Sequence, residues 1–249
     1  MIDRVFESMF HWYRLVGGAS DGARALERDG VLAAVVPAAP ERAVVNAVLY
    51  RSADGLEAAY DEVAAAYAEI GAKWTVWLPP GDDAAARLLE GRGHYLDAEP
   101  MAMARELNGV ERPAADGLAN WTAEGELAEV GPVNDRSYSF GTDSFSRALQ
   151  TLPDGAAHVY LARDEEGAPI GCLAILDHEG NSEVQMVAVV PEARGRGITS
   201  KLLGHALADA AERGSETATL IATPLGYPVY ERIGFRPLDR VAMWERAPA

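Results

Sequence analysis

The feature that most limits what this chain can fold into is an internal repeat. The segments WTVWLPP and ARLLEGRGHYLDAEPMAMARE, within residues 74–106, align with ATLIATP and YPVYERIGFRPLDRVAMWER, within residues 218–246, apart from a gap of a few residues. Self-similarity of this kind indicates that one supersecondary unit occurs twice. The sequence therefore predicts a duplicated fold whose two halves end in the same succession of elements.

The two copies differ at positions that could carry chemistry. Gly93 of the first copy matches Gly234 of the second, but Leu89 stands where the second copy has Tyr230. The first copy also has only RSADG between a strand ending at Tyr50 and the next helix, so it lacks a glycine-arginine loop that the second copy has. We therefore expect that only the second copy kept its chemistry.

A break in the apolar pattern separates the copies. Residues 108–120, NGVERPAADGLAN, are rich in glycine, proline and small residues, which indicates a boundary between a domain at 1–110 and a domain at 111–249. Periodicity and cap signals predict the elements of each domain. They are, in the first domain, helices at 5–16, 56–70 and 82–90 and strands at 31–36, 44–50, 74–78 and 101–106; in the second, helical segments within 124–149, helices at 199–213 and 225–233, strands at 158–163, 170–176, 183–190 and 218–222, and a closing strand pair within 235–244.

The composition is that of a globular protein in water. Of 249 residues, 49% are hydrophobic and 24% are charged. Charged residues interrupt the N-terminal segment, and no stretch has the roughly 20 apolar residues that cross a bilayer, so we expect a cytoplasmic protein without a membrane partner. The single cysteine, Cys172, excludes an intrachain disulfide and is expected to be a small buried side chain.

The charge balance limits the partners. The formal net charge is −16, whereas neutralising nucleic-acid phosphates requires a basic surface, so we expect no nucleic-acid partner. The five histidines show no spacing typical of metal ligands, and we expect no metal. Acidic groups could steer a cationic substrate, although a well-solvated surface is the simpler explanation.

One segment contrasts with this acidic background. In PEARGRGITSKLL, residues 191–203, two arginines and two glycines occupy four consecutive positions between an apolar strand and an amphipathic helix. The first turn of a helix has unpaired N–H groups and the positive end of the dipole, so a glycine loop at that point predicts a phosphate site. The order GITSK excludes a Walker loop, and Ser200 stands where a dinucleotide fingerprint needs its third glycine.

Two motifs of the second half occur in the order and spacing of a known family. Val189 to Pro191 precede Arg194–Thr199, which follows the pattern Q/R-x-x-G-x-G/A except that Thr199 replaces the last glycine or alanine. YERIGF, residues 230–235, follows the pattern aromatic-Glu-x-x-Gly-Phe, although Thr223 stands where many members have an asparagine. Over residues 120–246 the chain thus resembles the GNAT superfamily of acetyltransferases. The resemblance implies an α/β fold of the α+β type, with two tandem GNAT-like domains, each a mixed, mostly antiparallel twisted sheet flanked by helices.

The resemblance also implies a cosubstrate and the residues that bind it. The anion would be the pyrophosphate of acetyl-CoA, and the strand before the loop would bind the pantetheine arm like an added strand. The implied binding residues are Val187, Ala188, Val189, Arg194, Gly195, Arg196, Gly197, Ile198, Thr199 and Ser200.

Two side chains are candidates for proton transfer. Tyr230 occupies the position at which the family returns a proton to the departing thiolate, and a tyrosine packed in the core is the alternative. Glu183 lies eleven residues before Arg194, which is the spacing of the general base in the histone-modifying branch, and a solvated carboxylate at a strand start is the alternative. Tyr227 could line the site or simply pack.

The polar, aromatic segment 134–145 is where the resemblance places the acceptor pocket. Its Asp135 and Asp143 could receive a cationic acceptor. We therefore expect an N-acetyltransferase that uses a small-molecule or peptide amine in a ternary complex, as a monomer or homodimer. A non-catalytic coenzyme-A-binding sensor or interaction module is the alternative that the sequence leaves open.

Overall fold

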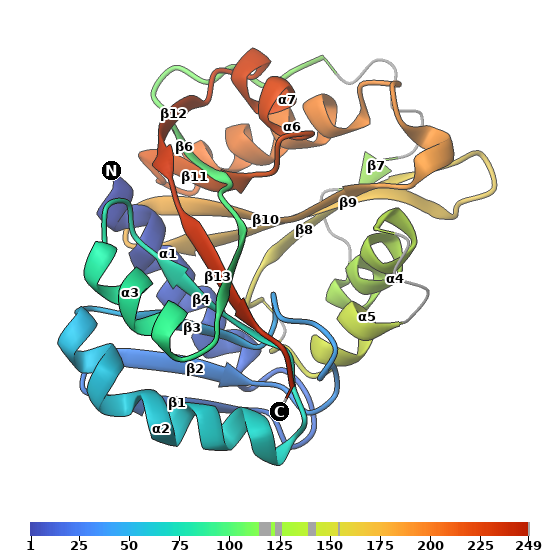
Figure 1. Ribbon diagram of the computed structural model, residues 1–249. Coiled ribbons are helices and arrows are strands. Elements are labelled where there is room, and N and C mark those ends of the chain that lie inside the picture. The colour runs from blue at the N-terminus through green and yellow to red at the C-terminus, as the bar shows by residue number, and fades with distance from the viewer. Residues whose placement is uncertain (115–120, 123–125, 139–142, 154, 249) are drawn as a thin grey trace.

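The structure is a computed structural model that describes residues 1–114, 121–122, 126–138, 143–153 and 155–248. Within these residues the strands form two sheets. Figure 1 shows the six-stranded sheet in its lower part and the seven-stranded sheet in its upper part. Both sheets are mixed and mostly antiparallel, with one parallel strand pair each. The predicted α/β class with two mixed sheets flanked by helices is therefore confirmed.

The first half of the chain contains three helices and six strands. Its helices are α1 (Ile2–Val16), α2 (Ala53–Glu69) and α3 (Asp83–Gly91), and its strands are β1 (Arg24–Arg28), β2 (Val31–Val35), β3 (Ala47–Tyr50), β4 (Trp74–Leu78), β5 (Tyr95–Ala98) and β6 (Met101–Glu106). The predictions for β4 and β6 are correct to the residue. β1 and β5 were not predicted, because they are the two edge strands of the first sheet and lie largely at the surface, so their sequences lack an apolar pattern.

The second half follows the prediction closely. Its helices are α4 (Leu127–Ser137), α5 (Ser144–Ala148), α6 (Ile198–Glu212) and α7 (Tyr227–Arg232), and its strands are β7 (Trp121–Thr122), β8 (His158–Arg163), β9 (Pro169–His178), β10 (Asn181–Val189), β11 (Thr217–Ala222), β12 (Arg236–Arg240) and β13 (Ala242–Arg246).

The two sheets exchange one strand each. β6 comes from the first half but lies between β11 and β12 of the second sheet and pairs antiparallel with both. β13 comes from the end of the chain but lies between β4 and β5 of the first sheet. β12 and β13 therefore belong to different sheets, and the predicted closing strand pair is wrong in that respect. Each sheet contains one strand from the other side of the predicted boundary between residues 110 and 111.

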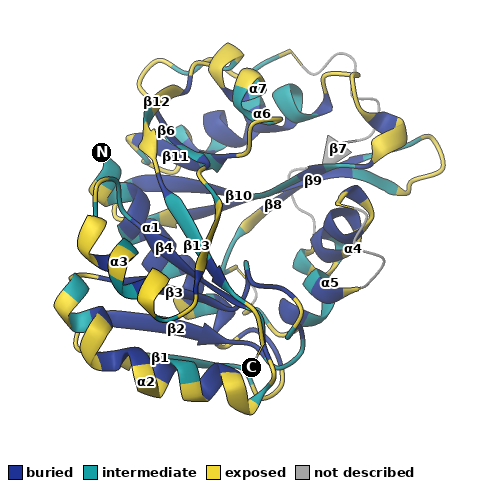
Figure 2. Cartoon of the chain, viewed as in Figure 1, coloured by how far each residue is buried: buried dark blue, intermediate teal, exposed yellow. Residues whose placement is uncertain are grey.

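Helix α1 lies between the two sheets and joins their cores. It contacts β2 and β3 of the first sheet and β9 and β10 of the second. Helices α2 and α3 pack against the first sheet in one apolar core, and α4, α6 and α7 pack with the second sheet in another. Figure 2 shows buried residues running through both sheets, while the outward faces of α2 and α3 are exposed.

Candidate functional site

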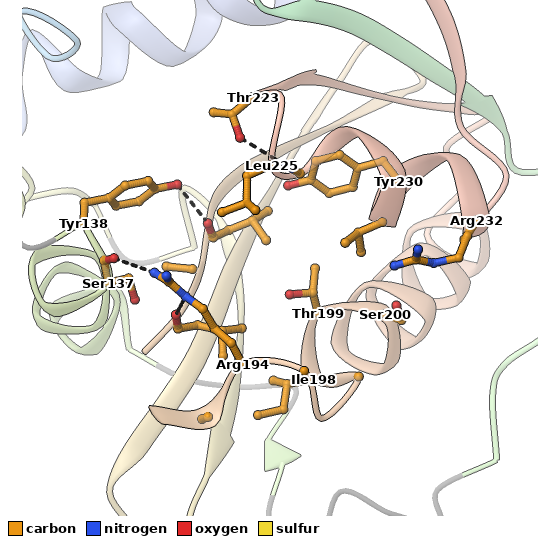
Figure 3. A pocket seen from close by; sticks show the side chains of 18 residues that line it. Ser137, Tyr138, Arg194, Ile198, Thr199, Ser200, Thr223, Leu225, Tyr230 and Arg232 are labelled. Atoms are coloured by element: carbon orange, nitrogen blue, oxygen red, sulfur yellow. Dashed lines mark hydrogen bonds between the residues drawn. The ribbon is translucent and has the colours of Figure 1, made fainter. Parts of the chain in front are cut away.

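The candidate site lies where two parallel strands separate. β10 and β11 pair from Asn181–Thr217 to Glu183–Thr219, and among the described residues their recorded pairing ends there. A cavity of about 550 Å³ lies beyond this point (Figure 3). It is lined by the end of β10, the start of α6, the segment from β11 into α7, and the end of α4, namely Ser137, Tyr138, Val187, Ala188, Val189, Ala193, Arg194, Gly195, Gly197, Ile198, Thr199, Ser200, Thr223, Leu225, Gly226, Val229, Tyr230 and Arg232.

One end of the cavity is the N-terminus of α6. Its N-cap is Gly197 with φ +74°, and Gly195 has φ +77°, a left-handed backbone that favours glycine. A Cβ atom built on either glycine would meet no heavy atom within 4 Å, so open space lies directly against the backbone. The N–H groups in the first turn have no intrahelical acceptor. These features fit a phosphate group, as the sequence predicted for this loop.

The two loop arginines do not both face that end. Arg194 lines the cavity, but its guanidinium donates to the backbone carbonyls of Val189 at 3.2 Å and Ser137 at 2.7 Å. Arg196 donates to the carbonyl of Glu192 at 3.1 Å and is not among the lining residues. Arg194 thus ties the loop to the end of α4, and the direct binding role predicted for Arg196 stays a prediction.

A third arginine, which the sequence reasoning missed, lies on the opposite wall. Arg232 of α7 lines the cavity and points toward Ser200 at the start of α6 (Figure 3). It is two residues after Tyr230 in YERIGF, so its position beside the predicted tyrosine is the sequence signal that could have identified it. Arg232 is well placed to meet an anion held at the helix N-terminus.

A bulge in β10 shapes the middle of the cavity. The register of β10 against β9 shifts between Gln185 and Ala188, and Met186 has φ +56°. The Met186 carbonyl accepts hydrogen bonds from Asn134 Nδ2 at 3.1 Å and from Cys172 Sγ at 3.3 Å. Burial raises the pKa of Cys172 to about 12, so its thiol stays protonated and can donate. Because a bulge bends its strand, this one directs the end of β10 away from β11.

Tyr138, the C-cap residue of α4, lies along one side of the cavity. The hydroxyl of Tyr138 donates to the carbonyl of Val187 at 3.4 Å. In Figure 3 this hydroxyl and that of Tyr230 point toward each other from α4 and α7. The side chain of Leu225, 77% exposed, also lines the cavity. Apolar surface that is open to solvent therefore surrounds the end of β10.

The YERIGF motif is a helix C-cap that holds Tyr230. The N–H of Phe235 donates to the Tyr230 carbonyl at 3.1 Å and that of Gly234 to the Glu231 carbonyl at 3.0 Å, with φ +97° at Gly234, which is a Schellman motif. The rings of Tyr230 and Phe235 are in edge contact, with centroids 6.1 Å apart. Tyr227 instead donates to Glu231 and does not line the cavity.

The chemical state of Tyr230 suits a proton donor. Its side chain is 8% exposed, and burial raises its pKa well above the ordinary tyrosine value. The hydroxyl is therefore protonated at neutral pH. Among the described residues it forms no hydrogen bond, and it lines the cavity.

Glu183, the predicted base, does not line this cavity. It is 2% exposed, accepts a hydrogen bond from Gln185 Nε2 at 2.7 Å through Oε1, and its Oε2 has no partner among the described residues. When ionised, Glu183 helps to raise the pKa of Tyr13, so its carboxyl lies near helix α1, between the two sheets. Burial raises the pKa of Glu183 to about 8. The carboxyl is thus not a solvated group at a strand start, and its role as a base stays a prediction.

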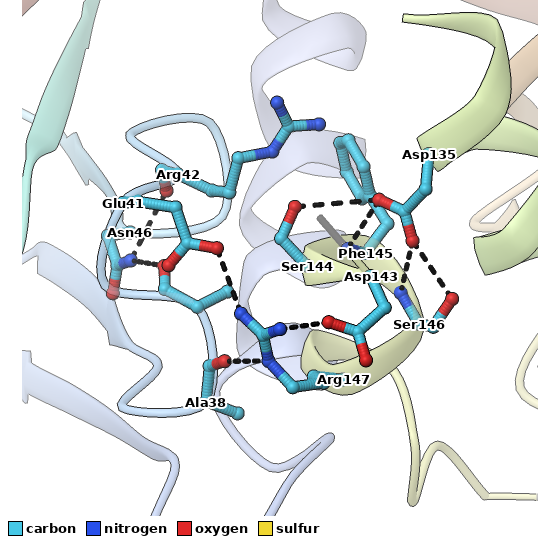
Figure 4. Close-up of polar contacts among 11 residues, drawn as sticks. Ala38, Glu41, Arg42, Asn46, Asp135, Asp143, Ser144, Phe145, Ser146 and Arg147 are labelled. Carbon is cyan, nitrogen blue, oxygen red and sulfur yellow. Dashed lines mark hydrogen bonds and ion pairs between the residues drawn. The ribbon is translucent and has the colours of Figure 1, made fainter. Parts of the chain in front are cut away.

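The two aspartates expected to receive a cationic acceptor have other partners. Asp135 accepts hydrogen bonds from the backbone N–H groups of Phe145 at 3.0 Å and Ser146 at 3.2 Å, at the start of α5 (Figure 4). Asp143 pairs with Arg147, whose guanidinium also reaches the first half of the chain. Both carboxylates therefore stabilise α5 and the contacts that it makes with the rest of the chain. Their expected role, to receive a cationic substrate, has no support in this geometry. Residues 139–142 of the same segment lie outside the described residues.

Comparison with known proteins explains the combination of loop, bulge and capped tyrosine. Residues 155–237 match the family model of the acetyltransferase (GNAT) domain. This segment of the second half is thus similar to GNAT acetyltransferase domains. The matched residues include the glycine loop, the bulge of β10 and Tyr230. Among the described residues, no group of three or more His, Cys, Asp or Glu side chains is arranged to hold a metal ion, and no helix has the length and apolar character of a membrane span.

Relatives match different parts of the chain. An uncharacterized N-acetyltransferase of Streptomyces griseus subsp. griseus is 44% identical over 59 residues, which are 24% of this chain and 14% of that protein. Mycothiol acetyltransferase of Clavibacter sepedonicus is 28% identical over 177 residues, or 67% of this chain and 56% of that protein. The chain thus covers less than two thirds of the length of either relative.

The fold of the whole chain also has a counterpart. The structure of a GCN5-related N-acetyltransferase from Kribbella flavida superposes with a TM-score of 0.67 at 17% identity, covering 97% of this chain and 95% of that one. Because both halves are covered, that structure shares the fold of the first half, which lacks the glycine loop, as well as that of the second.

Proposed function

We propose that this protein transfers an acetyl group from acetyl-CoA to an amine acceptor by direct attack in a ternary complex. The observation that supports this most is that one cavity joins the start of α6, the end of β10 and Tyr230. These are the three parts that the transfer needs: a pyrophosphate site, a strand edge for the pantetheine arm, and a proton donor for the thiolate. The volume of about 550 Å³ is typical of a small-molecule site.

The residues of the cavity suggest how acetyl-CoA would bind. Its pyrophosphate would accept hydrogen bonds from the first N–H groups of α6, next to Gly195 and Gly197, with the guanidinium of Arg232 opposite. Its pantetheine arm would lie along residues 187–189 of β10, where Tyr138 and Leu225 provide apolar contact. Arg194 would act indirectly, by tying the loop to α4.

The chemistry then requires two proton transfers. The amine nitrogen attacks the thioester carbonyl carbon, a C–N bond forms, the C–S bond breaks, and the thiolate takes a proton from the Tyr230 hydroxyl. The amine must lose a proton, and a lysine-like amine with a pKa of about 10.4 is mostly protonated at pH 7. Glu183 is our candidate acceptor of that proton, through intervening water, because its Oε2 has no partner among the described residues. Only its ionised form can accept a proton, and with a pKa of about 8 that form is the minor one at pH 7 and the major one at higher pH.

We expect the acceptor to be a small molecule or a peptide, and the reaction to take place in the cytoplasm. A small-molecule acceptor is favoured by the similarity to a protein named mycothiol acetyltransferase. We propose no nucleic-acid or membrane partner, and either a monomer or a homodimer.

The test is a screen of amine classes for coenzyme A release from acetyl-CoA, measured with a thiol reagent. The proposal expects release that depends on both the amine and Tyr230. Tight acetyl-CoA binding without amine-dependent release from any class would favour the alternative, a coenzyme-A-binding sensor.

A further inference from the structure

The C-terminal end of α7, the helix that carries Tyr230, accepts a hydrogen bond from a side chain of the other half of the chain. Nη1 of Arg105 donates to the carbonyl of Ile233, which is the C-cap residue of α7. Arg105 belongs to β6, the strand that the first half contributes to the second sheet, where it lies opposite Ala218 of β11. The strand exchange thus brings a guanidinium of the first half to the end of the α7 helix.

The surroundings of Arg105 are built for this single contact. Among the described residues no carboxylate acts on it, and its partial burial lowers its pKa. Its side chain lies against Gly234, where an added Cβ would be 3.4 Å from Nε. A charged donor that is partly shielded from solvent and faces a backbone carbonyl makes a stronger hydrogen bond than a neutral donor would. The contact therefore fixes the end of α7 more firmly than the cap alone.

That end of α7 is directly connected to Tyr230. The N–H of Ile233 donates to the Tyr230 carbonyl at 3.1 Å, and the N–H of Phe235 donates to the same carbonyl. The helix has six residues, so it depends on its caps and packing more than on its own turns. Because the Tyr230 hydroxyl forms no hydrogen bond among the described residues, its position is set by the backbone and by the packing of its ring in the core, which includes the contact with Phe235.

We propose that Arg105 is a positioning residue for Tyr230, through which the first half of the chain holds the proton donor of the second half in the cavity. This inference depends on the proposed function, since it assigns to Arg105 an effect on a step that Tyr230 performs. It also gives the first half, which has no glycine loop, a part in the reaction.

The experiment is a double-mutant cycle between Arg105→Met and Tyr230→Phe in the full chain. Met keeps the apolar stem and removes the donor, so we expect kcat to fall about tenfold with acetyl-CoA affinity unchanged within about twofold. In the Tyr230→Phe background the same change should have almost no effect, because no hydroxyl is left to position. Arg105→Lys, which keeps a cationic donor, should recover most of the lost kcat.

The matched control is Arg240→Met. Arg240 also donates to a backbone carbonyl, that of Glu99 at 2.8 Å, but this carbonyl is remote in sequence from α7, so kcat should not change. An unchanged kcat in Arg105→Met, or an equal fall in both backgrounds, would overturn the inference. If Arg105→Met does not fold, the same two comparisons apply to Arg105→Leu, which also removes the donor. If Tyr230→Phe alone leaves kcat unchanged, the fault lies in the proposed role of Tyr230 itself.

Discussion

The two halves of the chain begin the corresponding helix in opposite ways. In the first half, α2 starts at the N-cap residue Ser52, whose hydroxyl accepts a hydrogen bond from the N–H of Gly55 at 3.1 Å. In the second half, α6 starts at Gly197, which has no side chain, and open space lies next to its backbone. A helix that caps itself has less to offer a ligand. The comparison indicates that a duplicated fold can lose an anion site by satisfying it internally.

The ends of the next helices share a cap but differ in the capped side chain. In α3 the N–H of His94 donates to the Leu89 carbonyl and that of Gly93 to the Glu90 carbonyl, both at 3.0 Å, as in the cap of α7. Leu89 is fully buried where α7 has Tyr230. The first half therefore retains the backbone arrangement and lacks the hydroxyl that would donate a proton.

The largest expected effect in this comparison of the two halves comes from disrupting the strand exchange. If the halves are interlocked, deletion of residues 242–249 should leave a gap between β4 and β5 and abolish cooperative unfolding, measured by circular dichroism. Residues 1–114 and 121–249, expressed together as two chains, should still assemble and co-purify, because the cut leaves every strand of the two sheets present. Folding of residues 1–110 alone would show instead that the first half is independent.

The second largest effect is expected from the capped tyrosine. Tyr230→Phe should lower kcat about 100-fold, the low end of general acid contributions, with little change in acetyl-CoA affinity. Tyr227→Phe, on the same helix but outside the cavity, is the control and should keep near-wild-type kcat. A Tyr230→Phe variant with wild-type kcat, when chemistry is rate-limiting, would assign Tyr230 to core packing.

Most helices and strands could be predicted from the sequence, but the order of the strands within the two sheets could not. Apolar runs identify β4 and β6 to the residue, and the two motifs identify the glycine loop and Tyr230, which line the cavity. An apolar run does not specify which strand lies beside it, so the exchange of β6 and β13 could not be foreseen. Nor could the bulge at Met186, because a positive φ at a non-glycine residue depends on the contacts from Asn134 and Cys172.

The next test concerns Glu183 and the effect of its burial on stability. Burial raises the pKa of Glu183 to about 8 from its ordinary value near 4.5, so the folded state keeps a proton that the unfolded state loses. Stability should therefore fall as pH rises from about 4.5 to about 8, by up to roughly 1.4 kcal/mol per pH unit. Glu183→Gln removes this loss, so its stability relative to wild type, from urea unfolding, should increase with pH. A constant difference between pH 5 and 8 would contradict the buried protonated carboxyl.

A further test concerns the third arginine. Arg232→Met should weaken acetyl-CoA binding about tenfold at low salt, and less at high salt, because it removes a cationic donor facing the pyrophosphate site. Arg236→Met, on β12 and exposed, is the matched control and should bind normally. Equal affinities for both variants would show that the backbone N–H groups of α6 hold the anion alone.

The central claim is that only the second half binds acetyl-CoA, at the start of α6. Calorimetric titration of the full chain with acetyl-CoA tests this most directly, together with Gly197→Leu, which fills the open space and disfavours the φ of +74°. We expect one site per chain in the wild type and no measurable binding in a folded Gly197→Leu variant. Two sites per chain, or undiminished affinity in that variant, would contradict the account.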